Sequence, residues 1–126
     1  SESPRPAEMR MQVFSAAEEK VIGVVEVDEA VQREAELWLR SISGKAPEVK
    51  IDADCGYIFK IPLLKSVSVQ TKPFTGTVRQ VLLFYCPDMT PKLLLFSDNH
   101  QPHFVTFSHP LQPFLEQMNA YRFMKN

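Results

Sequence analysis

The most regular hydrophobic pattern in the chain lies between residues 28 and 44. Asp28 is a favourable N-cap residue, and Gly44 suits the left-handed position that follows many helices. Between them, apolar side chains recur at helical spacing, at Val31, Ala35, Trp38, Leu39 and Ile42. The pattern predicts an amphipathic helix over residues 29–43 that covers one face of a sheet.

Two β-rich runs precede this helix. They are MRMQVF (9–14) and KVIGVVEV (20–27), and the polar stretch SAAEE separates them. Runs rich in β-branched and other apolar residues around a short polar link are typical of a hairpin. We therefore expect the chain to begin with two antiparallel strands.

Five further runs with strand character follow the helix, and turn residues divide them. They are GYIFKIPL (56–63), SVSVQ (66–70), VRQVLLFY (78–85), PKLLLFS (91–97) and HFVTF (103–107). Because the links are short, consecutive strands are expected to be antiparallel neighbours.

The end of the chain returns to helical spacing. Leu111, Phe114, Leu115 and Met118 predict a short second helix, with Pro113 tolerated in its first turn. The resulting order, β-β-α-β-β-β-β-β-α, indicates an α+β fold. We expect a curved antiparallel sheet with one long and one short helix packed on one face.

Composition limits the class of protein. A chain of 126 residues, 44% hydrophobic and 23% charged, has the size and balance of one globular domain. Residues 1–8, SESPRPAE, are polar and predict a disordered spacer before a single domain at residues 9–126. Because the chain opens with Ser1, a signal peptide, a lipid anchor or an expression tag is expected to have preceded it.

The net charge of −1 makes nucleic acid an improbable ligand, since its binders concentrate basic residues on one face. No apolar run approaches the roughly 20 residues that span a bilayer. The chain also has no phosphate-binding loop, GxSxG or HExxH motif, so no well-marked enzyme class is indicated and no cofactor is expected.

All three histidines fall within one stretch, FSDNHQPHFVTFSHP (96–110). Imidazole is a common zinc ligand, but six residues of strand would place His103 and His109 about 20 Å apart. His100 follows Asp98 and Asn99, which are ordinary turn residues. The stretch therefore predicts a hairpin turn and a strand rim, with no metal site.

Cys55 and Cys86 are the only cysteines. In a simple meander with an extra strand between them they would fall at opposite ends of the sheet, farther apart than the roughly 7 Å that a disulfide allows. We expect two unpaired thiols. A free thiol leaves open a catalytic cysteine, which would need a histidine or another activator beside it.

Acidic residues are scattered over turns. Asp52 and Asp54 in DADCG have a spacing seen in metal-binding loops, but the further oxygen ligands of a calcium loop are missing. The expected role of this stretch is a solvated turn.

Aromatic residues are numerous, and they gather late in the chain. The list includes Phe104, Phe107, Phe114, Tyr121 and Phe123. They are expected to fill the core beneath the second helix, and the alternative is an exposed aromatic groove. The candidate ligand-binding residues are Asp98, His100, His103 and Phe104, and the possible ligands are a protein, a glycan or a small apolar molecule.

Three stretches, VDEAVQREAELWLRSISG, GYIFKIPL and LLLFSDNHQPHFVTF, resemble small exported proteins of unknown function from spore-forming Gram-positive bacteria. The resemblance covers roughly residues 9–118. It implies an extracytoplasmic location and no established activity, and it assigns a role to no residue.

The sequence therefore predicts an exported or envelope-associated binding or structural module. The alternatives are a cytoplasmic location, a carrier with a cavity beneath the Trp38 helix, and a small hydrolase. The hydrolase site would be built from turn residues near Asp54, Cys55, Asp98 and His100.

Overall fold

A computed structural model describes residues 9–47 and 56–121 of the chain. In chain order the elements are β1 (Arg10–Ser15), β2 (Lys20–Glu26), α1 (Glu29–Arg40), β3 (Ile42–Lys45), β4 (Tyr57–Gln70), β5 (Thr75–Tyr85), β6 (Lys92–Phe96), β7 (Pro102–Phe107) and α2 (Gln112–Asn119). The predicted order of strands and helices is confirmed.

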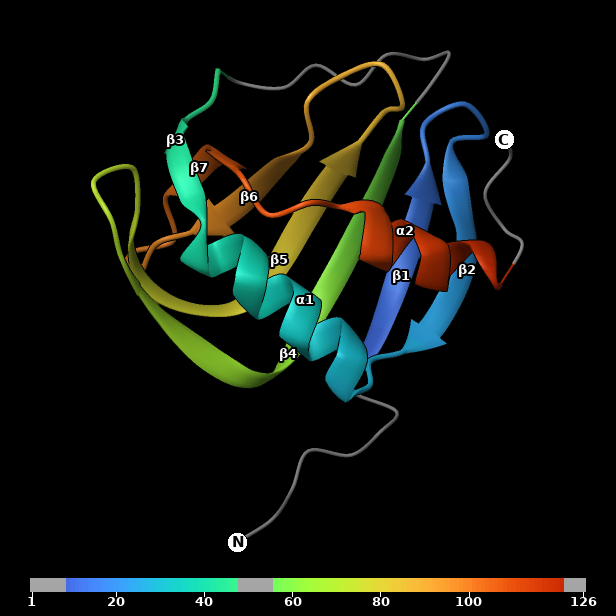
Figure 1. Cartoon of the computed structure of the whole chain (residues 1–126), viewed down its shortest axis with the longest axis horizontal. Helices are drawn as coiled ribbons and strands as arrows, with labels where there is room; N and C mark the ends of the chain where they lie inside the picture. The colour runs from blue at the N-terminus through green and yellow to red at the C-terminus, as the bar shows by residue number, and fades with distance from the viewer. Residues whose placement is uncertain (1–8, 48–55, 122–126) are drawn as a thin grey trace, which may run out of the picture.

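The seven strands form one antiparallel sheet in the order β2-β1-β4-β5-β6-β7-β3. Figure 1 shows the sheet curling around α1, with both helices on the same face. The α+β fold with helices gathered on one side of a curved sheet is therefore confirmed. Neither helix covers the other face of the sheet.

The core lies between the sheet and the two helices. Trp38 of α1, Phe114 of α2 and Phe59 of β4 are all fully buried. The Trp38 and Phe114 rings meet edge to face at 5.0 Å, and Phe114 meets Phe59 in the same way at 5.1 Å. This aromatic stack joins both helices to β4, as the predicted helix faces require.

α1 ends earlier than predicted. Asp28 caps its start, with Oδ1 accepting from the N–H of Val31 at 2.9 Å. The helix stops at Arg40, however, and Ile42–Lys45 forms strand β3, which the sequence analysis missed. Ile42 and Gly44 pair with Phe107 and Thr106 of β7. Pairing across the sheet therefore overrides the helical spacing that continues to Ile42.

A second correction concerns the long strand β4. GYIFKIPL and SVSVQ were expected to be separate strands, but they are parts of one strand of 14 residues. An irregularity between Pro62 and Val67 replaces the expected break. The number of strands still agrees with the prediction because the unpredicted β3 makes up for the fusion.

The remaining predictions on helices agree with the structure. α2 begins at Gln112 with Pro113 in its first turn, and Phe114 and Met118 are its buried residues. Among the described residues, neither helix is long and apolar enough to cross a membrane.

Candidate functional site

A pocket of about 420 Å³ lies beside the middle of the sheet, between β5 and the turn that joins β6 to β7. Its volume falls in the range of ligand sites in proteins. We call it the β5–β6 pocket; its lining residues are Thr77, Val78, Arg79 and Gln80 on one side and Phe96, Ser97, Asp98 and His100 on the other.

The pocket exists because β5 and β6 separate. The two strands pair over only three residues of β5, from Leu82 to Phe84. Before Leu82, β5 stays paired with β4 and leads away from β6. Residues 67–70 of β4 and 75–78 of β5 form a hairpin, which we call the hairpin arm and which curls around in Figure 1. The register shift in β4 between Pro62 and Val67 lies at the same level as this separation. Such irregularities bend a strand and increase its twist, so we attribute the opening to the bulge in β4.

The side chain of Gln32 on α1 holds this bulge in place. Its Oε1 accepts a hydrogen bond from the N–H of Leu64 at 2.7 Å, and its Nε2 donates to the carbonyl of Lys65 at 3.1 Å. Among the described residues, Gln32 is also one of two buried polar residues, with 7% of its surface exposed. A helix side chain therefore supplies partners to backbone groups in the segment of β4 that does not pair with β5.

The far end of the pocket is closed by Asp98. Its Oδ1 accepts from the N–H of Thr77 at 3.2 Å. A Cβ atom added at Gly76 would lie 3.5 Å from the same oxygen and 3.2 Å from the Phe74 ring, so the turn packs closely on this part of β5. The Phe74 ring in turn contacts His103 of β7 edge to face at 5.4 Å. The hairpin arm is thus docked onto the β6–β7 end of the sheet.

The β6–β7 turn is fixed by its own hydrogen bonds. Ser97 Oγ donates to Asn99 Oδ1 and accepts from the N–H of Gln101, and the N–H of His100 donates to the carbonyl of Ser97. His100 has a left-handed φ of 65°, which is uncommon for a residue with a side chain. This backbone places the imidazole at the pocket rather than along the strand.

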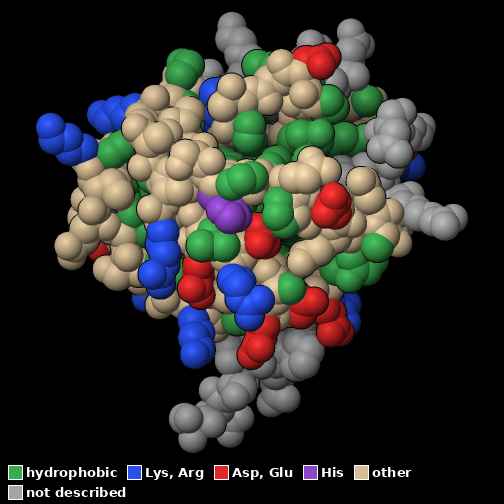
Figure 2. Space-filling model, in the orientation of Figure 1, with side chains coloured by type: hydrophobic (Ala, Val, Ile, Leu, Met, Phe, Trp, Pro, Cys, Tyr) green, Lys and Arg blue, Asp and Glu red, His purple; other side chains and the backbone are tan. Residues whose placement is uncertain are grey.

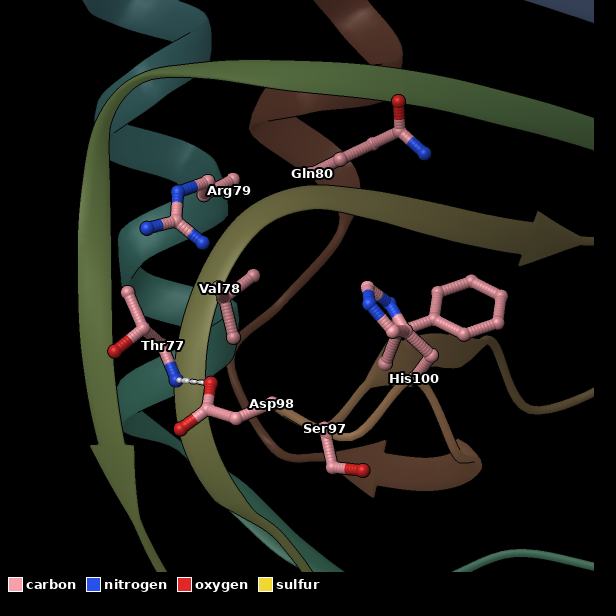
Figure 3. Close-up of a pocket in the computed structure, with 8 residues that line it drawn as sticks. Thr77, Val78, Arg79, Gln80, Ser97, Asp98 and His100 are labelled. Carbon is pink, nitrogen blue, oxygen red and sulfur yellow. Dashed lines mark hydrogen bonds between the residues drawn. The ribbon is translucent and has the colours of Figure 1, made fainter.

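Strand β5 contributes its backbone to the pocket wall. Successive side chains of a strand point to opposite faces, so four consecutive residues can line one pocket only if the edge of the backbone forms the wall. Figure 3 shows the Arg79 side chain on the opposite side of β5 from His100. Among the described residues, no strand pairs with Val78 to Val81 on this edge.

The structure brings two of the four candidate ligand-binding residues together. Asp98 and His100 both line the β5–β6 pocket. His103 instead packs its ring on Phe74, and Phe104 meets Phe84 edge to face at 5.5 Å on the helix-free face of the sheet. His100 lies in the turn and His103 on β7, as predicted for a hairpin.

The third histidine serves another contact. Nε2 of His109 lies 3.2 Å from Oε1 of Glu34 on α1, and both side chains are largely buried. The N–H of His109 donates to Ser41 Oγ at 3.0 Å, and Ser41 Oγ donates to the carbonyl of Leu37. These bonds fasten the segment between β7 and α2 to the end of α1. Within the described residues, no three side chains of the metal-ligating types come together.

The prediction of unpaired cysteines is wrong for Cys86, which is disulfide-bonded. The chain has one other cysteine, Cys55, which lies outside the described residues. The prediction failed because it counted an extra strand between the two positions. In the structure Tyr57, at the start of β4, pairs directly with Tyr85, the residue before Cys86, so these strand ends share one end of the sheet.

The described residues contain only part of the hydrolase alternative. A sulfur held in a disulfide is not available as a nucleophile, so Cys86 offers no attacking thiolate. Asp54 and Cys55 lie outside the described residues, along with the expected turn at Asp52. Of that residue set, only Asp98 and His100 are placed, and in the described structure no hydrogen bond links them.

The helix-free side of the sheet carries two rows of cross-strand neighbours. One row is Gln12, Lys60, Leu82, Leu94 and Phe104, and the other is Phe14, Ile58, Phe84 and Lys92. Directly opposed residues of adjacent strands share a face, and the residues that alternate with these rows are the buried core residues. We call these two rows the open face.

The open face is apolar with positive charges. Six of its nine residues are Leu, Ile or Phe, and its charged residues are both lysines. Among the described residues, neither Lys60 nor Lys92 forms an ion pair with a carboxylate. Over α1 the surface differs, because Figure 2 shows acidic and basic side chains interspersed there.

Phe96 connects the open face with the pocket. It follows Leu94 by two positions on β6, so it points to the same side of the sheet, and it also lines the pocket. Its side chain is a large apolar group that remains exposed, at 42%. Phe96 therefore lies at the boundary between the open face and the pocket.

Sequence reasoning missed Gln32, Lys60 and the β5 residues that line the pocket. Gln32 carried a signal, because it lies three positions before Ala35 and seven before Leu39, on the buried stripe of the helix. A polar residue on such a stripe requires a buried partner. The β5 residues carried no comparable signal, since the pocket depends on how two strands diverge in space.

No family model, no curated protein and no solved structure matches this chain. The resemblance to exported proteins of spore-forming bacteria therefore stays a prediction.

Proposed function

We propose that this protein is an extracytoplasmic binding module that acts without catalysis and binds a partner protein on its open face. The observation that carries the proposal is the row of apolar side chains from β4 to β7 on a sheet face that no helix covers. Contiguous apolar surface of this kind is typical of sites of association.

The disulfide supports the proposed location. Disulfides persist in oxidising compartments and are rare where the cytosol keeps thiols reduced. Cys86 is disulfide-bonded, and it directly follows Tyr85, which pairs with Tyr57 at the same end of the sheet. An exported protein would keep this bond.

Charge complementarity indicates the chemistry of the partner. Lys60 and Lys92 are the charged groups of the open face, and they lie among leucine, isoleucine and phenylalanine side chains. An apolar surface bordered by carboxylates would bury the apolar residues and pair with both lysines. The partner is therefore an acidic protein surface.

Two other occupants are disfavoured, for different reasons. A second copy stacked face to face would set the lysines of one open face against those of the other, and such like-charge contacts are costly. A bilayer surface would need projecting apolar side chains, whereas Leu82, Leu94 and Phe104 are half-buried between their neighbours.

Site-specific photo-crosslinking in the producing cell tests the proposal. A benzoylphenylalanine at Val24, which is 53% exposed and pairs with Gln12 at the margin of the open face, should capture one protein. The same group at Gln112, on the helix side, is the control and should not capture it. Equal capture at both positions, or none at Val24, would contradict the proposal.

The captured protein is then purified and titrated against two charge variants. Lys60→Glu should weaken its binding by about tenfold or more at low salt, because the exchange replaces attraction with repulsion. Lys20→Glu is the matched control, since Lys20 is an exposed lysine of β2 outside the two rows. Equal losses for both variants would exclude the open face as the binding surface.

Two direct measurements examine the other occupants. Sedimentation of the isolated protein should give a monomer, and a dimer that Lys60→Glu strengthens would assign the face to self-association. Flotation with vesicles of phosphatidylglycerol and phosphatidylcholine should show no binding that depends on Lys60. Vesicle binding that Lys60→Glu abolishes would instead identify the open face as a membrane-binding surface.

A further inference from the structure

The β5–β6 pocket has the features of a gap in a sheet that another chain can fill. Its wall on one side is the backbone edge of Thr77 to Gln80, and β5 has β4 on its other edge. We infer that the β5–β6 pocket binds a short extended peptide segment, which adds backbone hydrogen bonds to β5. This inference deepens the proposed function, because the segment would belong to the partner that covers the open face.

The two ends of the gap fix its length. At one end, β5 and β6 are joined by the pairing of Leu82 with Leu94, and at the other end Asp98 bonds to Thr77. Four residues of β5, from 78 to 81, lie between these points. At about 3.3 Å per residue the open edge is roughly 13 Å long. It therefore accepts about two to four residues of extended chain, as a chain end or a loop tip.

Asp98 already makes one contact of the kind that a peptide would make. Its carboxylate accepts the N–H of Thr77 at 3.2 Å, where a neighbouring strand would present a carbonyl. Beyond Thr77 the edge has no strand beside it in the described structure, so its backbone groups can accept a new partner. Main-chain bonds of this type supply affinity in strand addition.

The side chains around the gap indicate what the segment carries. Phe96 offers an exposed ring on the open-face side, and His100 presents its imidazole from the turn. In the described part of the chain the His100 ring has no hydrogen-bond partner. An apolar side chain beside Phe96 and a polar group within reach of His100 would complement both residues.

The terminal strands β2 and β3 give an internal comparison, because each has one edge without a strand beside it in the described structure. In β2, a register shift at Val13 and Phe14 interrupts the pairing with β1. Irregular pairing and flanking charges such as Lys20 and Glu26 are features that protect edges from further pairing. A peptide with only general strand-forming tendency would also have access to β2 and β3, whereas the inferred segment selects β5.

Selection from a phage-displayed random heptapeptide library tests the inference. A selected peptide, made synthetically, is added to the isotope-labelled protein and followed by amide NMR shifts. The expected shifts centre on residues 78–81 and 96–100. A selection that yields no peptide, or shifts that centre on β2 or β3, would overturn the inference.

The contribution of the backbone is measured on the peptide, so that folding of the protein is not affected. Methylation of alternate backbone nitrogens removes donors and should weaken binding about tenfold or more for one of the two methylation patterns. Equal affinity of the methylated and unmethylated peptides would show recognition by side chains alone and would refute strand addition.

A pair of protein variants locates the site. His100→Asn keeps a residue that tolerates the left-handed backbone but removes the imidazole. This variant should bind the peptide several-fold more weakly. Gln101→Ala changes an exposed neighbour outside the pocket and should leave the affinity unchanged. Equal effects of the two variants would contradict the location. A last comparison separates the two proposals. If Lys60→Glu abolishes binding of the partner protein but the selected peptide does not compete with that partner, this inference is refuted and the proposed function stands.

Discussion

The side-chain oxygen of Gln32 lies 2.7 Å from the backbone nitrogen of Leu64 and accepts its hydrogen bond. The same carboxamide donates to the carbonyl of Lys65, so one helix side chain satisfies two backbone groups of the β4 bulge. The bulge is at the level where β5 leaves β6. This contact between α1 and β4 therefore supports both the core and the shape of the pocket.

Replacement of Gln32 by leucine should destabilise the protein by about 2–4 kcal/mol, because two partly buried backbone groups lose their partners. Urea unfolding followed by circular dichroism measures the change. Arg40→Ala is the control on the same helix: it removes an exposed ion pair to Glu36 and should cost no more than about 0.5 kcal/mol. A similar small loss for Gln32→Leu would show that water replaces the carboxamide at the bulge.

Trp38 tests the aromatic stack between the helices. Its side chain is fully buried against Phe107 and Phe114, so Trp38→Ala should cost about 3–5 kcal/mol. Trp38→Phe should cost clearly less, because Nε1 of Trp38 has no hydrogen-bond partner among the described residues and its loss removes an unsatisfied polar group. Thermal unfolding of both variants measures the difference. Equal losses would mean that Nε1 finds a partner in solution.

The disulfide at Cys86 should stabilise the folded chain by restricting the unfolded one. Cys86→Ala is expected to lower the free energy of unfolding by about 2–4 kcal/mol. Dithiothreitol should lower the melting temperature of the natural protein to that of the variant and leave the variant unchanged. A natural protein insensitive to the reductant would show that the thiols are free in solution.

The contact between Asp98 and Thr77 is suited to a paired substitution. Asp98→Ala removes the acceptor, so the Thr77 amide should exchange with solvent faster, whereas Asp98→Asn keeps an oxygen acceptor and should largely preserve its protection. Because Asp98 is exposed, the global stability should change by less than about 1 kcal/mol for both. Equal protection in all three proteins would mean that the hairpin arm is held without Asp98, by contacts such as that of Phe74 with His103.

Local patterns determined much of this fold. The spacing from Val31 to Leu39 and the cap at Asp28 predicted α1 and its buried face, and the β-rich runs predicted the hairpin of β1 and β2 and the strands from β5 to β7. These features depend on neighbours a few residues apart, where propensity and periodicity act directly. The α+β class followed from their order along the chain.

Long-range pairing decided the rest. Ile42 continues the helical spacing in sequence, yet it joins β7 because Phe107 offers it a strand partner. Cys86 is disulfide-bonded because β4 continues through its bulge and brings Tyr57 beside Tyr85.

The candidate site has the same origin. Asp98 and His100 could be singled out as turn residues, but their position opposite β5 depends on the divergence of two strands and on Gln32, which is more than 30 residues from the bulge in sequence. Local sequence patterns were enough to place most helices and strands and to identify their apolar faces. Where the strands part could not be predicted from them, because contacts between residues far apart in the chain set register and curvature.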